Sequence, residues 1–194
     1  MLDCDFSSVG ADSVDLLTCY RATIRDSVIT CSGSFTAINA LNNVNGLLIE
    51  GNTVSGGSAG RAIRVGQSQT VGIRNNIIES SLDGIWIAST SDTGDGNCNG
   101  VDVSNNYIEQ CSTPFVFAKQ FSMLGLSCKD NYVSNSSTSV IATRTNVITH
   151  GRLRGAEITD NSFYILSATE NLVDVVMNVA RIYKSFSYQV KSKT

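Results

Sequence analysis

The sequence predicts an all-β protein, a parallel β-helix of about seven coils, and two observations carry this prediction. A short phrase recurs along the chain: a small residue, two apolar residues two positions apart, then Asn, Asp or Gly, then Asn, and soon another apolar residue. Residues 100–108 hold the clearest copy. The Asn returns at steps of 24 to 30 residues, a period typical of stacked repeats. Its seven positions are Ser27, Asn52, Asn76, Asn106, Asn131, Asn161 and Ser185, with Ser in place of Asn at both ends.

Each repeat is expected to hold three short strands. Apolar residues alternate with a period of two in the phrase, which is the period of a strand. This second strand ends at Asn, a residue that tolerates left-handed backbone angles and therefore predicts a sharp corner. A third strand follows the corner. First strands precede the phrase at residues 34–37, 62–65, 84–87, 114–117, 139–142 and 172–175, and residues 13–16 are a further candidate.

Stacked coils would place equivalent residues in rows along the axis. One repeat cannot bury its own apolar face, but stacked neighbours can. The side-chain amides of the five Asn residues are expected to form a hydrogen-bonded ladder at one corner. The two inward rows expected in the second strands are Leu47, Val71, Val101, Leu126 and Ala156, and then Ile49, Ile73, Val103, Cys128 and Ile158.

The 194 residues are consistent with one domain. Residues 1–19 are expected to be a weakly patterned start or a partial first coil, residues 20–179 the β-helix, and residues 180–194 a last coil or exit strand. Residues 88–99 and 143–154 are insertions at the same corner of two coils, and insertions in solenoids often mark the binding face. No amphipathic helix caps the first coil, which favours a longer protein or a covering subunit.

Composition excludes several classes of function. Only 16% of residues are charged and the net charge is −3, without the basic patch of a nucleic-acid-binding protein. No apolar run reaches membrane-spanning length, and the acidic start lacks the apolar core of a signal peptide. The six cysteines lack zinc spacing and are predicted to be reduced thiols, with a Cys98–Cys111 disulfide as the alternative. His150 is the single histidine, which gives little support to a His-ligated metal site or a Ser-His-Asp triad, and no cofactor is predicted.

The recurring phrase, together with the Gly-Ile-x-Ile strand at residues 84–87, resembles the right-handed parallel β-helix of the pectate-lyase-like superfamily over roughly residues 20–190. Within it, the coils rich in Ser, Thr, Asn and Gly and the missing signal peptide are similar to bacteriophage tailspikes. The resemblance implies a homotrimer that binds and often cleaves a bacterial surface polysaccharide. It also implies synthesis in the bacterial cytoplasm and a place on the virion tail, with a bacterial cell-surface or secreted location as the alternative. Polygalacturonase motifs and the lyase calcium cluster are missing, which disfavours a secreted pectinase.

The outward positions of the first strands are the predicted sugar-binding face. Arg64 and Trp86 would be neighbours there, on adjacent coils. A solvent-facing indole can stack on a pyranose, and an arginine can hold a carboxylate or a pair of hydroxyl groups. The alternative is a covered Trp86 in cation–π contact with Arg64. Outward Val116 and Ile141 are expected to be exposed apolar neighbours and to mark a subunit interface.

Glycoside hydrolysis needs two carboxyl groups, and the candidates near this face are Asp83, Asp92 and Asp95. Each of the three also suits an ordinary turn or loop. Glu79 and Glu109 occupy equivalent positions on third strands and are expected to face solvent.

A basic cluster in the second insertion could attract an acidic polysaccharide. Its members are Arg144, His150, Arg152 and Arg154. The predicted function is therefore polysaccharide recognition, with endoglycosidic cleavage left open. The alternative is a non-catalytic structural shaft of a tail fibre or an adhesin. The two are separated by whether two carboxyl groups converge beside an exposed aromatic side chain.

Overall fold

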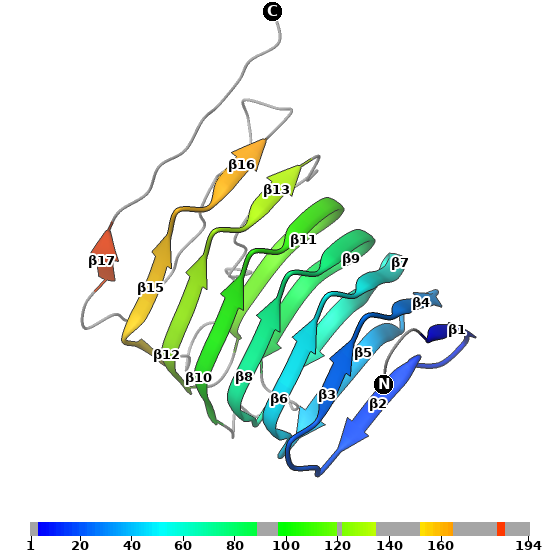
Figure 1. Ribbon diagram of the computed structural model, residues 1–194, viewed down its shortest axis with the longest axis horizontal. Helices are drawn as coiled ribbons and strands as arrows, with labels where there is room; N and C mark the ends of the chain where they lie inside the picture. The colour runs from blue at the N-terminus through cyan, green and yellow to red at the C-terminus, as the bar shows by residue number, and fades with distance from the viewer. Residues whose placement is uncertain (1–3, 89–96, 120–121, 135–151, 165–181, 185–194) are drawn as a thin grey trace, which may run out of the picture.

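The structure, a computed structural model, describes residues 4–88, 97–119, 122–134, 152–164 and 182–184. In these residues it is all β: a parallel β-solenoid of about five turns without a helix. Figure 1 shows the coils stacked side by side along one axis. The predicted parallel β-helix is confirmed. No helix long and apolar enough to span a membrane occurs in the part of the chain that the structure describes.

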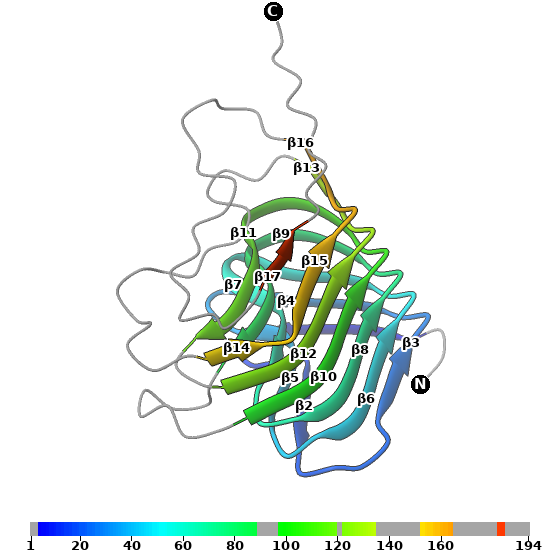
Figure 2. The same ribbon diagram turned by 90° about the vertical axis from the view of Figure 1, so that its left-hand side faces the viewer.

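The described strands form two sheets, and every strand pair is parallel. One sheet holds the second strands, which lie side by side in Figure 2. These are β3 (Thr23–Arg25), β6 (Asn45–Glu50), β8 (Gln69–Arg74), β10 (Asn97–Ser104), β12 (Ser122–Lys129), β15 (Ala156–Thr159) and β17 (Ile182–Lys184), with β14 (Arg152–Arg154) also paired to β12. The other sheet holds β1 (Asp5–Val9), β2 (Val14–Leu17), β4 (Val28–Ser32), β5 (Thr36–Asn42), β7 (Thr53–Val65), β9 (Ile77–Ala88), β11 (Tyr107–Lys119), β13 (Tyr132–Ser134) and β16 (Ser162–Tyr164).

The third strand of one repeat and the first strand of the next form one long bent strand in β7, β9 and β11, where separate strands were expected. Each of these strands turns at a residue with positive φ: Gly57 at 70°, Ser80 at 51° and Gln110 at 53°. Hydrogen bonding to the adjacent coil continues on both sides of the turn, so the bend does not end the strand.

The corner ladder of asparagine amides is present. Each Asn donates from Nδ2 to Oδ1 of the Asn in the next coil, at 3.0, 3.0, 2.9 and 2.8 Å from Asn52 to Asn161. The same Oδ1 also accepts from the backbone N of the preceding Asn, as in the 3.0 Å contact between Asn106 N and Asn131 Oδ1. The second N–H of each Nδ2 donates to a backbone carbonyl, for example from Asn106 Nδ2 to Ile73 O at 2.9 Å. Buried backbone groups at the corner are thus paired.

The residue before each ladder position adopts left-handed backbone angles, with φ between 51° and 68°. This explains why the phrase requires Asn, Asp or Gly there. The residues are Asp26, Gly51, Asn75, Asn105, Asp130 and Asp160.

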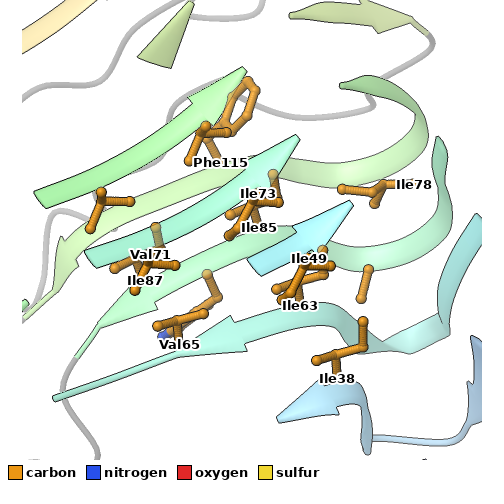
Figure 3. Close-up of a cluster of buried hydrophobic side chains, with 14 of the residues drawn as sticks. Ile38, Ile49, Ile63, Val65, Val71, Ile73, Ile78, Ile85, Ile87 and Phe115 are labelled. Atoms are coloured by element: carbon orange, nitrogen blue, oxygen red, sulfur yellow. The ribbon is translucent and has the colours of Figure 1, made fainter. Parts of the chain in front are cut away.

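The inward rows are also confirmed. Ile49, Ile73, Val103, Cys128 and Ile158 pair in register and are at most 6% exposed. The first strands contribute a facing row of Ile38, Ile63, Ile85 and Phe115, all fully buried. Figure 3 shows these isoleucines and Phe115 turned towards the second-strand residues across the interior. All six cysteines are free thiols, so the Cys98–Cys111 disulfide is not formed.

One first strand was predicted in the wrong register. Residues 34–37 were aligned with residues 62–65, but Ile38 pairs with Ile63, so residues 37–40 are the equivalent segment. Gly33, with φ of 74°, and the exposed Phe35 belong to the preceding corner. The candidate strand at residues 13–16 is confirmed, because Val14 in β2 pairs with Ile38. The strands expected at 139–142 and 172–175 lie outside the described residues.

Candidate functional site

The outward positions of the first strands carry a row of side chains along the axis. Asp15 pairs with Asn39, Asn39 with Arg64, and Arg64 with Trp86, on strands β2, β5, β7 and β9. Adjacent strands are about 4.8 Å apart, so the row offers one side chain per coil at that interval. We call these four residues the outer row. Figure 1 shows the strands that carry them following one another along the stack.

Two members of the outer row reach solvent and two are buried. Asp15 is exposed, Asn39 is 7% exposed, and Arg64 is partly exposed. Trp86 is only 4% exposed and Val116, its neighbour on β11, is fully buried. The expectations that Trp86 faces solvent and that Val116 is an exposed interface residue are therefore wrong. Because this burial occurs within one chain, no second subunit is needed to cover either side chain.

An ion pair lies beside the buried end of the row. Arg61 Nε is 3.2 Å from Asp83 Oδ2, and the Asp83 side chain has no exposed surface. The guanidinium carbon of Arg61 also lies 4.2 Å from the centre of the Trp86 ring. The cation–π contact is thus made by Arg61, not by Arg64 as the alternative reading expected. Arg61 and Asp83 are paired in register on β7 and β9, so the sheet itself holds the two charges together.

Arg64 is placed differently from Arg61. It has no ion pair among the described residues, whereas its Nε, like that of Arg61, is buried there without a hydrogen-bond partner. Burial lowers the pKa of Arg64 below its ordinary value, and the neighbouring Arg61 lowers it further, while Asp12 acts in the opposite direction. Asp12 Oδ1 itself accepts a 2.7 Å hydrogen bond from the backbone N of Thr36. Arg64 therefore carries a positive charge that the protein compensates only in part.

The side chain of Asn39, in the middle of the row, is uncharged and is held in one orientation. Asn39 Nδ2 donates to Asp15 Oδ1 at 3.1 Å, which fixes the amide. Its Oδ1 is buried without a hydrogen-bond partner among the described residues. Asn39 therefore lies between the carboxylate of Asp15 and Arg64, which are two coils apart.

A second surface, on the third strands, joins aromatic and acidic side chains. The rings of Tyr107 and Tyr132 stack at 5.3 Å with 9° between their planes, and the two residues are 39% and 42% exposed. Tyr107 Oη donates to Glu109 Oε2 at 2.9 Å, and this bond, with burial and nearby carboxylates, raises the pKa of Tyr107. Glu79 pairs in register with Glu109, and both are partly exposed. Two carboxyl groups thus lie beside an exposed aromatic here.

Among the predicted site residues, Arg64 and Trp86 are paired in register, and Asp83 pairs with Arg61, which contacts the Trp86 ring. Arg152 begins β14, which pairs with β12 in the other sheet. The remaining predicted residues, Asp92, Asp95, Arg144 and His150, lie outside the described residues. Within the described ranges, no three or more His, Cys, Asp or Glu residues are grouped so that they could hold a metal ion.

Sequence reasoning missed Arg61, Asn39, Asp12 and Asp15. The signal for two of them was the repeat itself, because Asp15, Asn39 and Arg64 follow one another at 24 and 25 residues. The wrong alignment of residues 34–37 hid this row. Nothing in the repeat distinguishes Arg61 from an ordinary corner residue, since its role depends on Asp83 and Trp86 of the next coil.

These features define a β-helix with one irregular, charged row on an otherwise repetitive surface. The family model described as "right handed beta helix region" matches residues 1–193. The chain belongs to this family, and its β-helix is right-handed. No curated protein and no solved structure matches the chain significantly. The fold is compatible with polysaccharide binding and with a structural role.

Proposed function

We propose that this β-helix recognises a bacterial surface polysaccharide along its outer row, in the manner of a phage tailspike. The observation that carries the proposal is the succession of Asp15, Asn39 and Arg64 at one-coil intervals along the axis. A linear polymer lying along the stack would meet Asp15 and Arg64, the two members that reach solvent, which are two coils or about 9.6 Å apart. In this proposal the chain forms a homotrimer, is made in the bacterial cytoplasm and is carried on the virion tail.

Trp86 has a supporting role in this proposal. A ring that is 4% exposed offers no face on which a sugar can stack. It instead contacts Arg61, whose ion pair with Asp83 fills the space next to Arg64. Recognition then depends on polar contacts made by Asp15 and Arg64, the two members of the row that reach solvent.

Cleavage is a separate question, because glycoside hydrolysis needs two carboxyl groups that reach the scissile bond. Asp83 has no exposed surface and serves as the counter-ion of Arg61, so it cannot reach a glycosidic oxygen. Among the described residues, Glu79 and Glu109 are two partly exposed carboxyl groups in register on adjacent coils, beside Tyr107. Any cleaving site in the described residues is therefore expected on the third strands.

The second candidate function is a non-catalytic shaft. It is favoured by the stacked pair Tyr107 and Tyr132, whose ring faces cover one another and so contribute to stiffness rather than to binding. The asparagine ladder, unbroken from Asn52 to Asn161, adds to the same rigidity.

The test is a panel of bacterial surface polysaccharides, measured for binding and for release of reducing ends. Wild type is compared with Arg64→Gln, Asp83→Asn and Glu109→Gln. Binding without release, lost in Arg64→Gln, is the expected result and identifies a lectin-like protein. Release that is lost in Glu109→Gln while binding persists would identify an enzyme acting on the third strands. Absence of binding to every polymer would leave the shaft function.

A further inference from the structure

The two arginines near the outer row are unequally compensated. Arg61 has Asp83 at 3.2 Å and the Trp86 ring at 4.2 Å. Arg64 has no ion pair within 4.0 Å in the part of the chain that the structure describes. Asp12 compensates Arg64 in part, and its Oδ1 also accepts a hydrogen bond from the Thr36 backbone. Within the described ranges, Arg64 is therefore compensated only by a carboxylate beyond ion-pair distance.

Such a charge is costly to the free protein. A cation that is partly removed from water, without an anion beside it, loses hydration that nothing replaces. Arg61 adds repulsion between like charges, and the lowered pKa of Arg64 reflects both causes. An anionic ligand beside Arg64 would remove this cost, and it would gain a charge-assisted hydrogen bond of the kind that arginine forms best.

No other member of the outer row forms an ion pair with Arg64. Asn39, the neighbour of Arg64 in the preceding coil, carries no charge, and its amide is bonded to Asp15 at 3.1 Å. The Asp15 carboxylate is therefore held two coils away from Arg64. Since Arg64 Nε is buried, an anion would reach the guanidinium through its terminal nitrogens.

We infer that the ligand of the outer row is a negatively charged polysaccharide whose anionic group binds Arg64. This inference rests on the proposed function and specifies the chemical class of its ligand. The anionic group is a carboxylate of an acidic sugar or a phosphodiester of the polymer backbone. Both offer the oxygen pair that a guanidinium binds in bidentate fashion, and the experiment below separates the two sources.

The first test measures binding of hyaluronate, teichoic acid and dextran, which supply a carboxylate, a phosphodiester and no charge. Carboxyl-reduced hyaluronate is the matched neutral polymer. A charged polymer is expected to bind at least about tenfold more tightly than its neutral counterpart, and Arg64→Gln should lose that difference. Arg25→Gln is the control, because Arg25 is exposed, lies on the other sheet and is 3.9 Å from Asp26. Equal binding of charged and neutral polymers would overturn the inference but leave the proposed function standing.

The second test moves a carboxylate next to Arg64 without changing the net charge. In the double variant Asp15→Asn with Asn39→Asp, the hydrogen bond between the two positions can reform while the negative charge lies one coil closer to Arg64. We expect a higher Tm than wild type and loss of the preference for charged polymers. Arg64→Gln should unfold at the same urea concentration as wild type or at a higher one. If the swap lowers Tm and Arg64→Gln is clearly destabilised, the uncompensated charge is refuted, even if none of the polymers binds and the proposed function itself fails.

Discussion

The corner ladder and the outer row are both lines of polar side chains repeated once per coil, yet they differ in how fully their hydrogen bonds are satisfied. At the corner, the Asn106 amide donates to Ile73 O and to Asn131 Oδ1, and its own Oδ1 accepts two hydrogen bonds from Asn76. In the outer row, Arg64 Nε and Asn39 Oδ1 are buried without a hydrogen-bond partner among the described residues. Similar stacking thus gives a hydrogen-bonded row at the corner and a row with unpaired buried groups on the first strands.

The difference follows from the side chains. An amide carries both a donor and an acceptor, so a row of identical asparagines can satisfy itself when repeated at the coil spacing. The outer row changes from acid to amide to cation to indole, and these groups cannot form one continuous chain of hydrogen bonds. Complete hydrogen bonding, rather than polarity, therefore distinguishes the corner ladder, which holds the coils together, from the outer row.

The largest expected effect concerns the corner ladder, the row whose hydrogen bonds are satisfied. Asn106→Ala removes a buried amide and leaves Ile73 O and the Asn76 backbone N without their partners. Unsatisfied buried groups cost roughly 1–3 kcal/mol each, so we expect a loss of about 3 kcal/mol or more in the free energy of unfolding, measured in urea. Asn105→Gly is the matched control, since φ of 55° suits glycine and the variant should unfold like wild type. A loss below about 1 kcal/mol in Asn106→Ala would show that the ladder is dispensable.

The next effect concerns the ion pair between Arg61 and Asp83, which lies beside the outer row. Asp83→Asn leaves the mostly buried Arg61 without its carboxylate and should cost about 2–3 kcal/mol, slightly less than a fully buried pair because Arg61 is 26% exposed. Asp102→Asn is the comparison, because its partner Arg74 lies 2.6 Å away but is 46% exposed. That variant should lose less than about 1 kcal/mol. Equal losses in the two variants would contradict the structural role of Asp83.

Alkaline pH tests the interior, where the ionisable groups include thiols. Burial raises the pKa of Cys111 from 9.0 to about 12, and that of Cys98 to about 11. Because the folded pKa lies above the unfolded one, this contribution to stability is complete below pH 9 and is lost as pH rises towards the folded value. For Cys111 alone the loss between pH 9 and pH 10 is about 1 kcal/mol.

Urea unfolding at these two pH values would measure that loss. Cys111→Ala should show a smaller decline than wild type, whereas Cys4→Ala, at a partly exposed position, should decline like wild type. Identical slopes for the two variants would mean that the interior thiols ionise freely in the folded protein.

The smallest effect concerns the stacked tyrosines, an outward row held by ring contact rather than by hydrogen bonds. Tyr107→Ala removes the 5.3 Å stack on Tyr132 and should cost about 1 kcal/mol. Tyr107→Phe keeps the stack, loses only the exposed bond to Glu109, and should unfold within about 0.5 kcal/mol of wild type. Comparable losses in both variants would attribute the effect to the hydroxyl rather than to the ring contact.

The fold was predictable because its determinants repeat. The positions from Asn52 to Asn161 mark the corner, and the alternation before each of them assigns the inward side chains. The burial of Trp86 was not predictable in this way. Alternation tells on which side of a strand a side chain lies, but what covers an outward side chain depends on residues distant in sequence. The same limit applies to Arg61, whose two partners both lie one coil further along.

The outer row was not predicted from the sequence because one first strand was misaligned. Ala37, Ile38 and Ala40 offer few distinguishing side chains, so a shift of three residues in the first coil went unnoticed and left Asn39 out of register. Alignment on hydrophobicity alone is weak where a strand is buried on both faces, as β5 is over residues 36–40.

Because of the asparagine ladder, the length of this solenoid can change only in units of one coil. Every rung is made by the same atoms, so any ladder Asn can succeed any other. Excision of residues 52–75, one full repeat, would join Gly51 to Asn76 and restore a left-handed glycine followed by a ladder amide. Removal of half a repeat would instead place a strand residue at the corner. Whole coils can therefore be gained or lost as units, and each such change alters the length of the solenoid by one rung.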